Sequence, residues 1–246
     1  MRIETINGRE LKFDPEQHKY WLDGNEVPSV TTITGQVDKS EPLMGWAVNT
    51  VIDYLAQHVD EIRDGSIVLK GENAHLLFSE AKAQHRELKK AAADMGTRVH
   101  RAVELYLKGE DCDLTGIERP FSAFLDWRFS WDQFELLASE VMTYDTYRNG
   151  YAGTADIIAR LNNEVWLIDL KTSPRIYDEY GMQLAAYQYA LSWCDQFDIT
   201  KTGILRLDKN SGAVEWKVYR YEETERYHKM FSHLCDFWWV KHRWQN

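Results

Sequence analysis

The chain has 246 residues, 44% of them hydrophobic, which is enough to bury the core of one sizeable domain. Its formal net charge of −10 argues against a large non-specific footprint on nucleic-acid phosphates, although a local basic patch or a bound cation can still attract them. The charged N-terminal segment lacks the apolar stretch of a secretory signal, and no apolar run is long enough to cross a membrane. The three cysteines are widely spaced and odd in number, which argues against a disulfide framework and a zinc knuckle. We therefore expect the protein in the reducing cytoplasm.

The first part of the chain predicts an accessory region over residues 1–95. Residues 11–34 are expected to form short strands around an Asp23-Gly24 turn. Apolar residues at helical spacing predict a helix over 42–62 and a longer one from about 73 to 107, which Gly96 could interrupt. Another helix is expected over 117–134.

The second part changes character and predicts the core of the fold over residues 96–246. Strands are expected at 136–145, 151–161 and 164–172, then a helix at 178–193, strands at 199–208 and 213–221, and a final helix. This order predicts an α/β fold with a central mixed sheet flanked by helices. We expect both parts to belong to a single domain.

The chemistry concentrates in one predicted hairpin. Asn162 and Asn163 suit a two-residue turn, because asparagine tolerates the positive φ that such turns require. Counting outward places Asp156 opposite Asp169, with Lys171 on the same face. The neighbouring residues are largely apolar, so two adjacent carboxylates need a compensating charge, and Mg²⁺ or Mn²⁺ suits oxygen ligands. A surface ion pair to Lys171 is the alternative, which the apolar setting disfavours.

Five segments carry further motifs in a fixed order: YWLDGNEVPSVTTIT at 20–34, GTRVHRAVELYL at 96–107, GTADII at 153–158, WLIDLKTS at 166–173 and QLAAY at 183–187. Together they resemble the RecB-like branch of the PD-(D/E)XK nuclease superfamily. The first is similar to the segment that opens the mitochondrial genome maintenance exonuclease and related phage proteins. CRISPR-associated RecB-like nucleases usually carry four cysteines for an iron–sulfur cluster. This chain lacks that pattern, so we expect no such cluster.

The resemblance implies a role for each residue of the hairpin. Asp156 and Asp169 would be metal ligands together with His100, and the backbone carbonyl of Leu170 could be a further ligand. Lys171 would position or deprotonate the attacking water, or stabilise charge on the phosphate. A packed or solvent-facing histidine is the ordinary alternative for His100.

Three more residues are candidates for catalysis. Gln183 and Tyr187 lie four apart on one helix face, where the resemblance makes them phosphate-positioning groups. A helix-surface pair explains their spacing nearly as well. Glu140, in the strand before the hairpin, could hold a second metal or orient a water, and a structural pairing with an arginine explains it equally well.

A basic stretch leads into His100. A solvated helix face is the usual explanation of such a run. In this acidic chain we instead expect it to follow the DNA backbone, with Thr172 and Ser173 as further DNA-binding candidates. The basic residues of the stretch are Lys82, Arg86, Lys89, Lys90, Arg98 and Arg101.

These observations predict a Mg²⁺- or Mn²⁺-dependent DNA exonuclease that hydrolyses phosphodiester bonds from free ends and favours single-stranded DNA. We expect it in the cytoplasm of a bacterial or phage-infected cell, in recombination, repair or replication, with a protein of these processes as a candidate partner. The resemblance implies 5′-phosphate and 3′-hydroxyl products. The alternatives are a structure-specific or restriction-type endonuclease, and a non-catalytic DNA-binding module that kept the fold. The joint presence of Asp156, Asp169 and Lys171 favours an active enzyme.

Overall fold

The computed structural model describes residues 1–246 except 39, 64–65, 70–73, 147–149 and 244–246. The chain forms two compact units. The core unit comprises Met1–Val37 and Arg98–Asn246, and the inserted unit comprises Asp38–Thr97. The second junction is close to the boundary expected between residues 95 and 96. The predicted accessory region over 1–95 is nevertheless not one unit, because its first 37 residues pack with the core.

The core unit is built on a five-stranded sheet with the order β11-β10-β9-β8-β7. Strands β9 and β10 are parallel, and the other neighbouring pairs are antiparallel, which confirms the predicted mixed α/β sheet. The strands are β7 (Phe134–Asp145), β8 (Tyr151–Leu161), β9 (Glu164–Lys171), β10 (Lys201–Leu207) and β11 (Val214–Tyr219).

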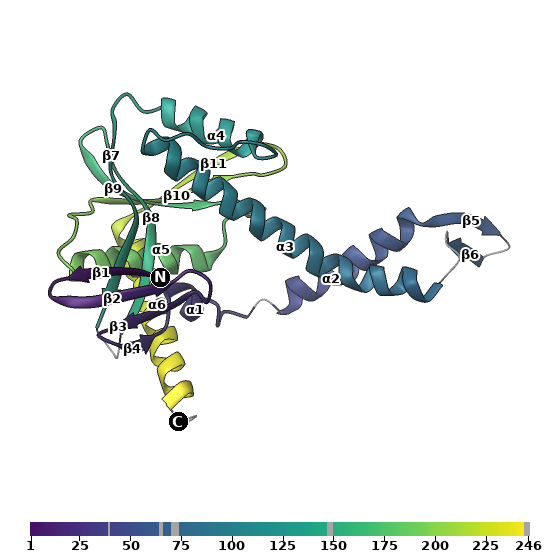
Figure 1. Ribbon diagram of the computed structural model, residues 1–246, viewed down its shortest axis with the longest axis horizontal. Coiled ribbons are helices and arrows are strands. Elements are labelled where there is room, and N and C mark those ends of the chain that lie inside the picture. The colour runs from purple at the N-terminus through teal and green to yellow at the C-terminus, as the bar shows by residue number, and fades with distance from the viewer. Residues whose placement is uncertain (39, 64–65, 70–73, 147–149, 244–246) are drawn as a thin grey trace. The chain divides into compact units, whose positions relative to one another are not determined.

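Helices flank this sheet, with α4 (Glu118–Phe129) on one side and α5 (Asp178–Trp193) and α6 (Tyr221–Arg243) on the other (Figure 1). Helix α5 has the predicted limits and buries Met182, Leu184 and Leu191 against the sheet and α6. Helix α4 ends at Phe129, earlier than predicted, because residue 134 already begins β7.

The predicted hairpin is present as β8 and β9. Asn162 and Asn163 have φ of 46° and 71°, as a two-residue turn between twisted strands requires. Leu161 pairs with Glu164, and this register continues to Ile157 and Ile168. The positions of Asp156 and Asp169 come next along the two strands, which confirms the predicted register.

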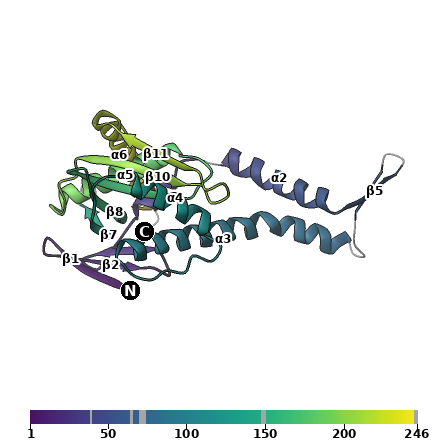
Figure 2. The ribbon, with the colours of Figure 1, turned by 90° about the horizontal axis from the view of Figure 1, so that it is seen from above.

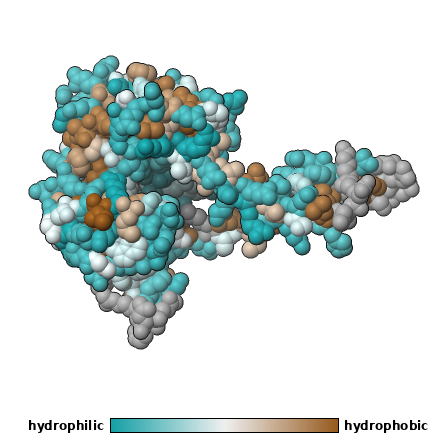
Figure 3. Space-filling view, in the orientation of Figure 1, coloured by the Kyte–Doolittle hydropathy of each residue, from teal (hydrophilic) through white to brown (hydrophobic). Residues whose placement is uncertain are grey.

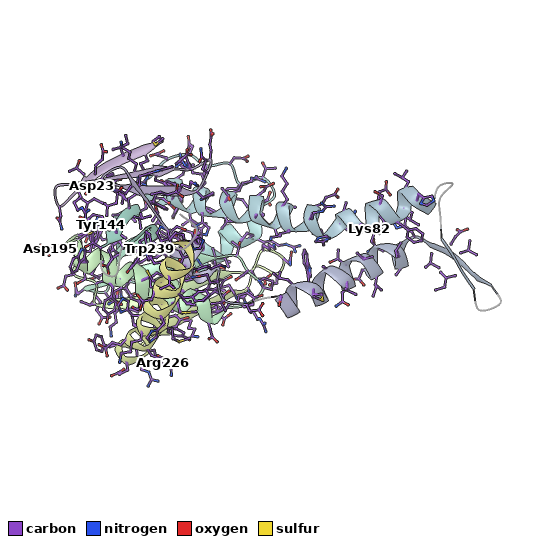
Figure 4. All side chains as sticks on the ribbon, turned by 90° about the horizontal axis from the view of Figure 1, so that it is seen from below. Asp23, Lys82, Tyr144, Asp195, Arg226 and Trp239 are labelled. Atoms are coloured by element: carbon purple, nitrogen blue, oxygen red, sulfur yellow. The ribbon has the colours of Figure 1, made fainter. Side chains whose placement is uncertain are left out.

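A second, antiparallel sheet of the core unit comprises β1 (Arg2–Ile6), β2 (Arg9–Asp14), β3 (Lys19–Leu22) and β4 (Asn25–Val27). The predicted Asp23-Gly24 turn joins β3 to β4, and both residues have positive φ (Figure 4 labels Asp23). The buried face of this N-terminal sheet packs against the end of β7 and the start of β8. Its apolar contacts explain why these residues belong to the core unit.

Residues predicted as strand after β4 form instead the short helix α1 (Val30–Thr34). Ser29 is its N-cap, since the Thr32 N–H donates to Ser29 Oγ at 2.9 Å. The backbone before it is held by β8, because the Ala152 N–H donates to the Pro28 carbonyl. Burial of Val30 and Ile33 then outweighs the strand preference of this β-branched segment.

The inserted unit contains α2 (Ser40–Gln57), β5 (Val59–Arg63), β6 (Ser66–Leu69) and the first part of α3 (Figure 2). Helix α3 spans Ala74–Leu107 without the interruption expected at Gly96, and its last ten residues belong to the core unit. The helix predicted over 42–62 ends at Gln57. Hydrophobic residues reach the surface of both units in patches separated by hydrophilic ones (Figure 3). None of the helices in the described part of the chain is long and apolar enough to cross a membrane.

Candidate metal centre

Three acidic residues occupy adjacent positions on three neighbouring strands. The pairs Ser139–Ile157 and Val141–Ala155 bracket Glu140 and Asp156 on β7 and β8. Asp169 follows Asp156 in the row, on β9. Directly opposed residues of antiparallel strands are close neighbours, so the sheet places the three acidic residues in one row.

Glu140 occupies an unusual backbone conformation within this row. Its φ of 52° is rare for a residue other than glycine, and the Arg2 guanidinium donates to its carbonyl at 2.7 Å. Burial, and then the charge of Asp156, raise the pKa of the Glu140 carboxyl to about 7. Strained backbone of this kind concentrates at functional sites, where the surrounding structure holds it in place.

Among the described residues, one group of side chains has the spacing to hold a metal ion: His100, Glu140 and Asp156, with one ligand atom of each lying within 4.8 Å of the others. His100 lies on the core-unit end of α3, and its Nδ1 is 3.6 Å from Asp156 Oδ2. The same oxygen accepts the Leu170 N–H at 2.8 Å. This cluster differs from the predicted ligands in its members, because it includes Glu140 and not Asp169, and Leu170 contacts it through its N–H and not its carbonyl. Which of these residues bind a metal stays a prediction.

Asp169 is the first member of a chain of polar contacts that continues through Lys171 and Gln183 to Tyr187. Its side chain is 1% exposed, and its Oδ2 lies 2.7 Å from Lys171 Nζ. Lys171 donates to Gln183 Oε1 at 3.1 Å, and Gln183 Nε2 donates to Tyr187 Oη at 3.1 Å. The predicted pair on α5 therefore lies inside the fold, joined to the hairpin, and not on a helix surface.

The charge state of Lys171 follows from its neighbours. Burial lowers the pKa of its ammonium group, but the charges of Asp169 and Asp156 outweigh burial and hold the pKa above its usual value. The Nζ atom also lies 4.9 Å from the centre of the Tyr180 ring. Lys171 therefore stays protonated at neutral pH, which favours a positioning or charge-stabilising role over that of a general base.

The candidate metal-binding cluster and three residues of the polar chain, Lys171, Gln183 and Tyr187, line one cavity of about 420 Å³. Its walls also include Gly153, where an added Cβ would lie 2.5 Å from the Tyr187 ring, so only glycine fits beside that ring. Residues that the sequence did not single out complete the lining: Arg2, Phe13, Pro15, His18, Tyr20, Ser29, Thr31 and Thr154. Tyr20, Ser29 and Thr31 belong to the segment at 20–34, from which we inferred a family resemblance but no role for single residues.

The DNA-binding candidates are divided between the two units. Lys89 and Lys90 are exposed on the inserted unit, as is Lys82, which Figure 4 labels on α3. Arg98 and Arg101 are exposed on the core unit. All five residues thus lie on α3, three of them in the inserted unit and two in the core unit.

Local contacts engage several of these candidates. Arg98 donates to the Thr115 carbonyl, and Arg101 donates to Glu104 at 2.7 Å. Thr172 and Ser173 are half-buried, and Ser173 Oγ donates to the Arg175 carbonyl. Their assignment to DNA stays a prediction.

No protein-family model matches the chain, and no curated protein is significantly similar to it in sequence. Among solved structures, the crystal structure of SSO0001 is similar over 77% of this chain and 86% of its own, with 14% sequence identity and a TM-score of 0.33. A likeness at this level carries no argument about family or activity.

Proposed function

We propose that the chain is a Mg²⁺- or Mn²⁺-dependent DNA exonuclease of the PD-(D/E)XK type, related to the RecB-like branch. The observation that supports this most is the sharing of one cavity by the His100, Glu140 and Asp156 cluster and by the Lys171 side chain. Acidic oxygens beside a protonated lysine suit phosphodiester hydrolysis, in which negative charge grows on the phosphate.

The residues fit a bound divalent cation. Glu140 and Asp156 repel each other in a partly buried site, and a cation between them would remove that repulsion. The buried Asp169 Oδ1 accepts no hydrogen bond from any described residue, so a bound water could still donate to it. One imidazole and two carboxylates are a ligand set that both Mg²⁺ and Mn²⁺ accept, and the imidazole shifts the preference toward Mn²⁺.

When bound, the cation polarises the phosphoryl oxygen and lowers the pKa of a coordinated water. The protein groups do the rest. Lys171 stabilises the developing charge on the phosphate and holds the attacking water by hydrogen bonding. Asp169 keeps the ammonium group charged, and Gln183 fixes its direction. Tyr187, whose hydroxyl oxygen accepts a hydrogen bond from Gln183, also lines the cavity and can donate its hydroxyl to the substrate phosphate.

The cavity supports a preference for strand ends. Its volume of about 420 Å³ lies within the range of small-molecule pockets, so it has room for about one nucleotide at a time. A flexible single strand enters such a space more readily than a stiff duplex. This favours an exonuclease acting on free single-stranded ends in recombination, repair or replication.

We therefore expect digestion to require a free end. With Mn²⁺, a linear single-stranded oligonucleotide should disappear first, a blunt duplex more slowly, and a covalently closed single-stranded circle should persist. All digestion should stop in EDTA. Gel analysis of end-labelled substrates measures the three rates. Rapid cutting of the circle would identify an endonuclease, and binding without cutting of any substrate would identify a non-catalytic DNA-binding module.

A further inference from the structure

One wall of the metal-site cavity comes from the N-terminal sheet and is aromatic. Phe13 is the last residue but one of β2, His18 lies in the turn before β3, and Tyr20 lies on β3. The Phe13 ring stacks on Tyr20 with centroids 4.5 Å apart and lies 6.0 Å from the His18 ring. Tyr20 is buried, Phe13 is half-buried and His18 is exposed, so the row of rings reaches from the core to solvent.

This aromatic wall is fixed to the strand that carries the metal ligand. Tyr20 Oη and Thr154 Oγ1 are hydrogen-bonded at 2.8 Å, and Thr154 lies two residues before Asp156 on β8. Arg2, from the same sheet, donates to the Glu140 carbonyl. The wall and the cluster therefore belong to one rigid arrangement within the core unit, and both line the same cavity.

Packing explains only part of this wall. Tyr20 belongs to the apolar cluster beneath the sheet, and Phe13 packs against its edge. The exposed His18 ring adds little to that core. His18 also adopts a φ of 52°, in the left-handed region that few residues enter. Because His18 is exposed and also lines the cavity, its ring has a surface available to a ligand.

We propose that Phe13 and His18 form a stacking platform for an unpaired nucleobase next to the scissile phosphate. This inference rests on the proposed function. It adds the side chains that would select single-stranded DNA over a duplex. Aromatic side chains stack on any base and give sequence-tolerant recognition of single strands. A base within a duplex is already stacked and paired, so it reaches the platform only after unpairing.

The stacking platform is tested by combining substitutions in the protein with removal of single bases from the DNA, and by asking whether the two losses of affinity are additive. Phe13→Leu keeps the apolar contact without the ring, and His18→Asn removes a ring while keeping a residue that tolerates positive φ. Trp21→Leu is the matched control, because it removes a half-buried aromatic ring of the same sheet that does not line the cavity. The substrates are a single-stranded oligonucleotide and a series with one abasic residue at successive positions from either end. Fluorescence anisotropy with Ca²⁺ in place of Mn²⁺ measures affinity without cutting.

We expect one abasic position to weaken binding to the wild type by roughly 5- to 100-fold. The combined Phe13→Leu and His18→Asn protein should bind the intact strand about that much more weakly, and should lose little more at that abasic position. Trp21→Leu should behave as the wild type. If the double variant unfolds, His18→Asn alone must show a smaller, equally non-additive loss, because this exposed side chain contributes little to the core.

The two ideas fail in different ways. A wild type that neither binds nor cuts single-stranded DNA would remove the proposed function. A wild type that does both, with the same abasic penalty in wild type and variant at every position, would overturn the stacking platform and leave the nuclease assignment intact.

Discussion

Asp156→Asn is expected to lower the rate of single-strand digestion by about 10³-fold or more. Asp156 is the central acid of the row and contributes to the cluster with His100 and Glu140. The asparagine oxygen can still accept the Leu170 N–H, so the hairpin should stay folded. Initial rates with Mn²⁺ measure the effect, and thermal melting with and without Mn²⁺ should show that the stabilisation by the cation is lost.

Asp195→Asn is the matched control for this prediction. Asp195 lies just after α5, is exposed, and has a φ of 49° that asparagine tolerates (labelled in Figure 4). The two variants lose the same charge, so a general electrostatic effect on DNA would slow both alike. Equal rates in Asp156→Asn and the wild type would show that the reaction takes place elsewhere.

Lys171→Met is expected to lower the digestion rate by about 10²- to 10³-fold, as the loss of one charge-stabilising donor does, and also to destabilise the protein. The ammonium group is the ion-pair partner of Asp169, whose side chain is 1% exposed. Removing one member of a buried pair leaves an uncompensated charge, which costs about 3 kcal/mol of unfolding free energy. Urea unfolding and initial rates measure the two effects separately.

The double variant Asp169→Asn with Lys171→Met separates catalysis from folding. It removes both charges from the pair, so most of the lost stability should return while the activity stays low. If the double variant cleaved at the rate of the wild type, Lys171 would be a structural residue only.

The hairpin could be predicted from the sequence because its determinants are local. Two asparagines fix the turn, and the turn fixes which residues of β8 and β9 face each other. The placement of Gln183 and Tyr187 on one face of α5 was equally predictable, because residues four apart in any helix are neighbours on one face. The contact from Lys171 to Gln183 was not, because it depends on how α5 packs against the sheet.

Long-range packing explains what the sequence left open. Glu140 lies beside His100 and Asp156, and its unusual φ is supported by Arg2, which is 138 residues away in the sequence. Residues 30–34 form a helix against their β-branched composition because Ser29 caps it and β8 supports it. No periodicity within one segment reports such contacts, so the aromatic wall and the grouping of Glu140 with His100 and Asp156 could be found only in the folded chain.

The location of the divalent cation is the most direct test of the proposed centre. Crystals grown or soaked with Mn²⁺ give an anomalous difference map that locates the ion independently of any activity. We expect a peak between the imidazole of His100 and the carboxylates of Glu140 and Asp156, at roughly 2.0–2.2 Å from the ligand atoms, as in octahedral sites of ions of this size. A protein that cleaves DNA with Mn²⁺ while its ion is bound at another place, with none at this cluster, would contradict it.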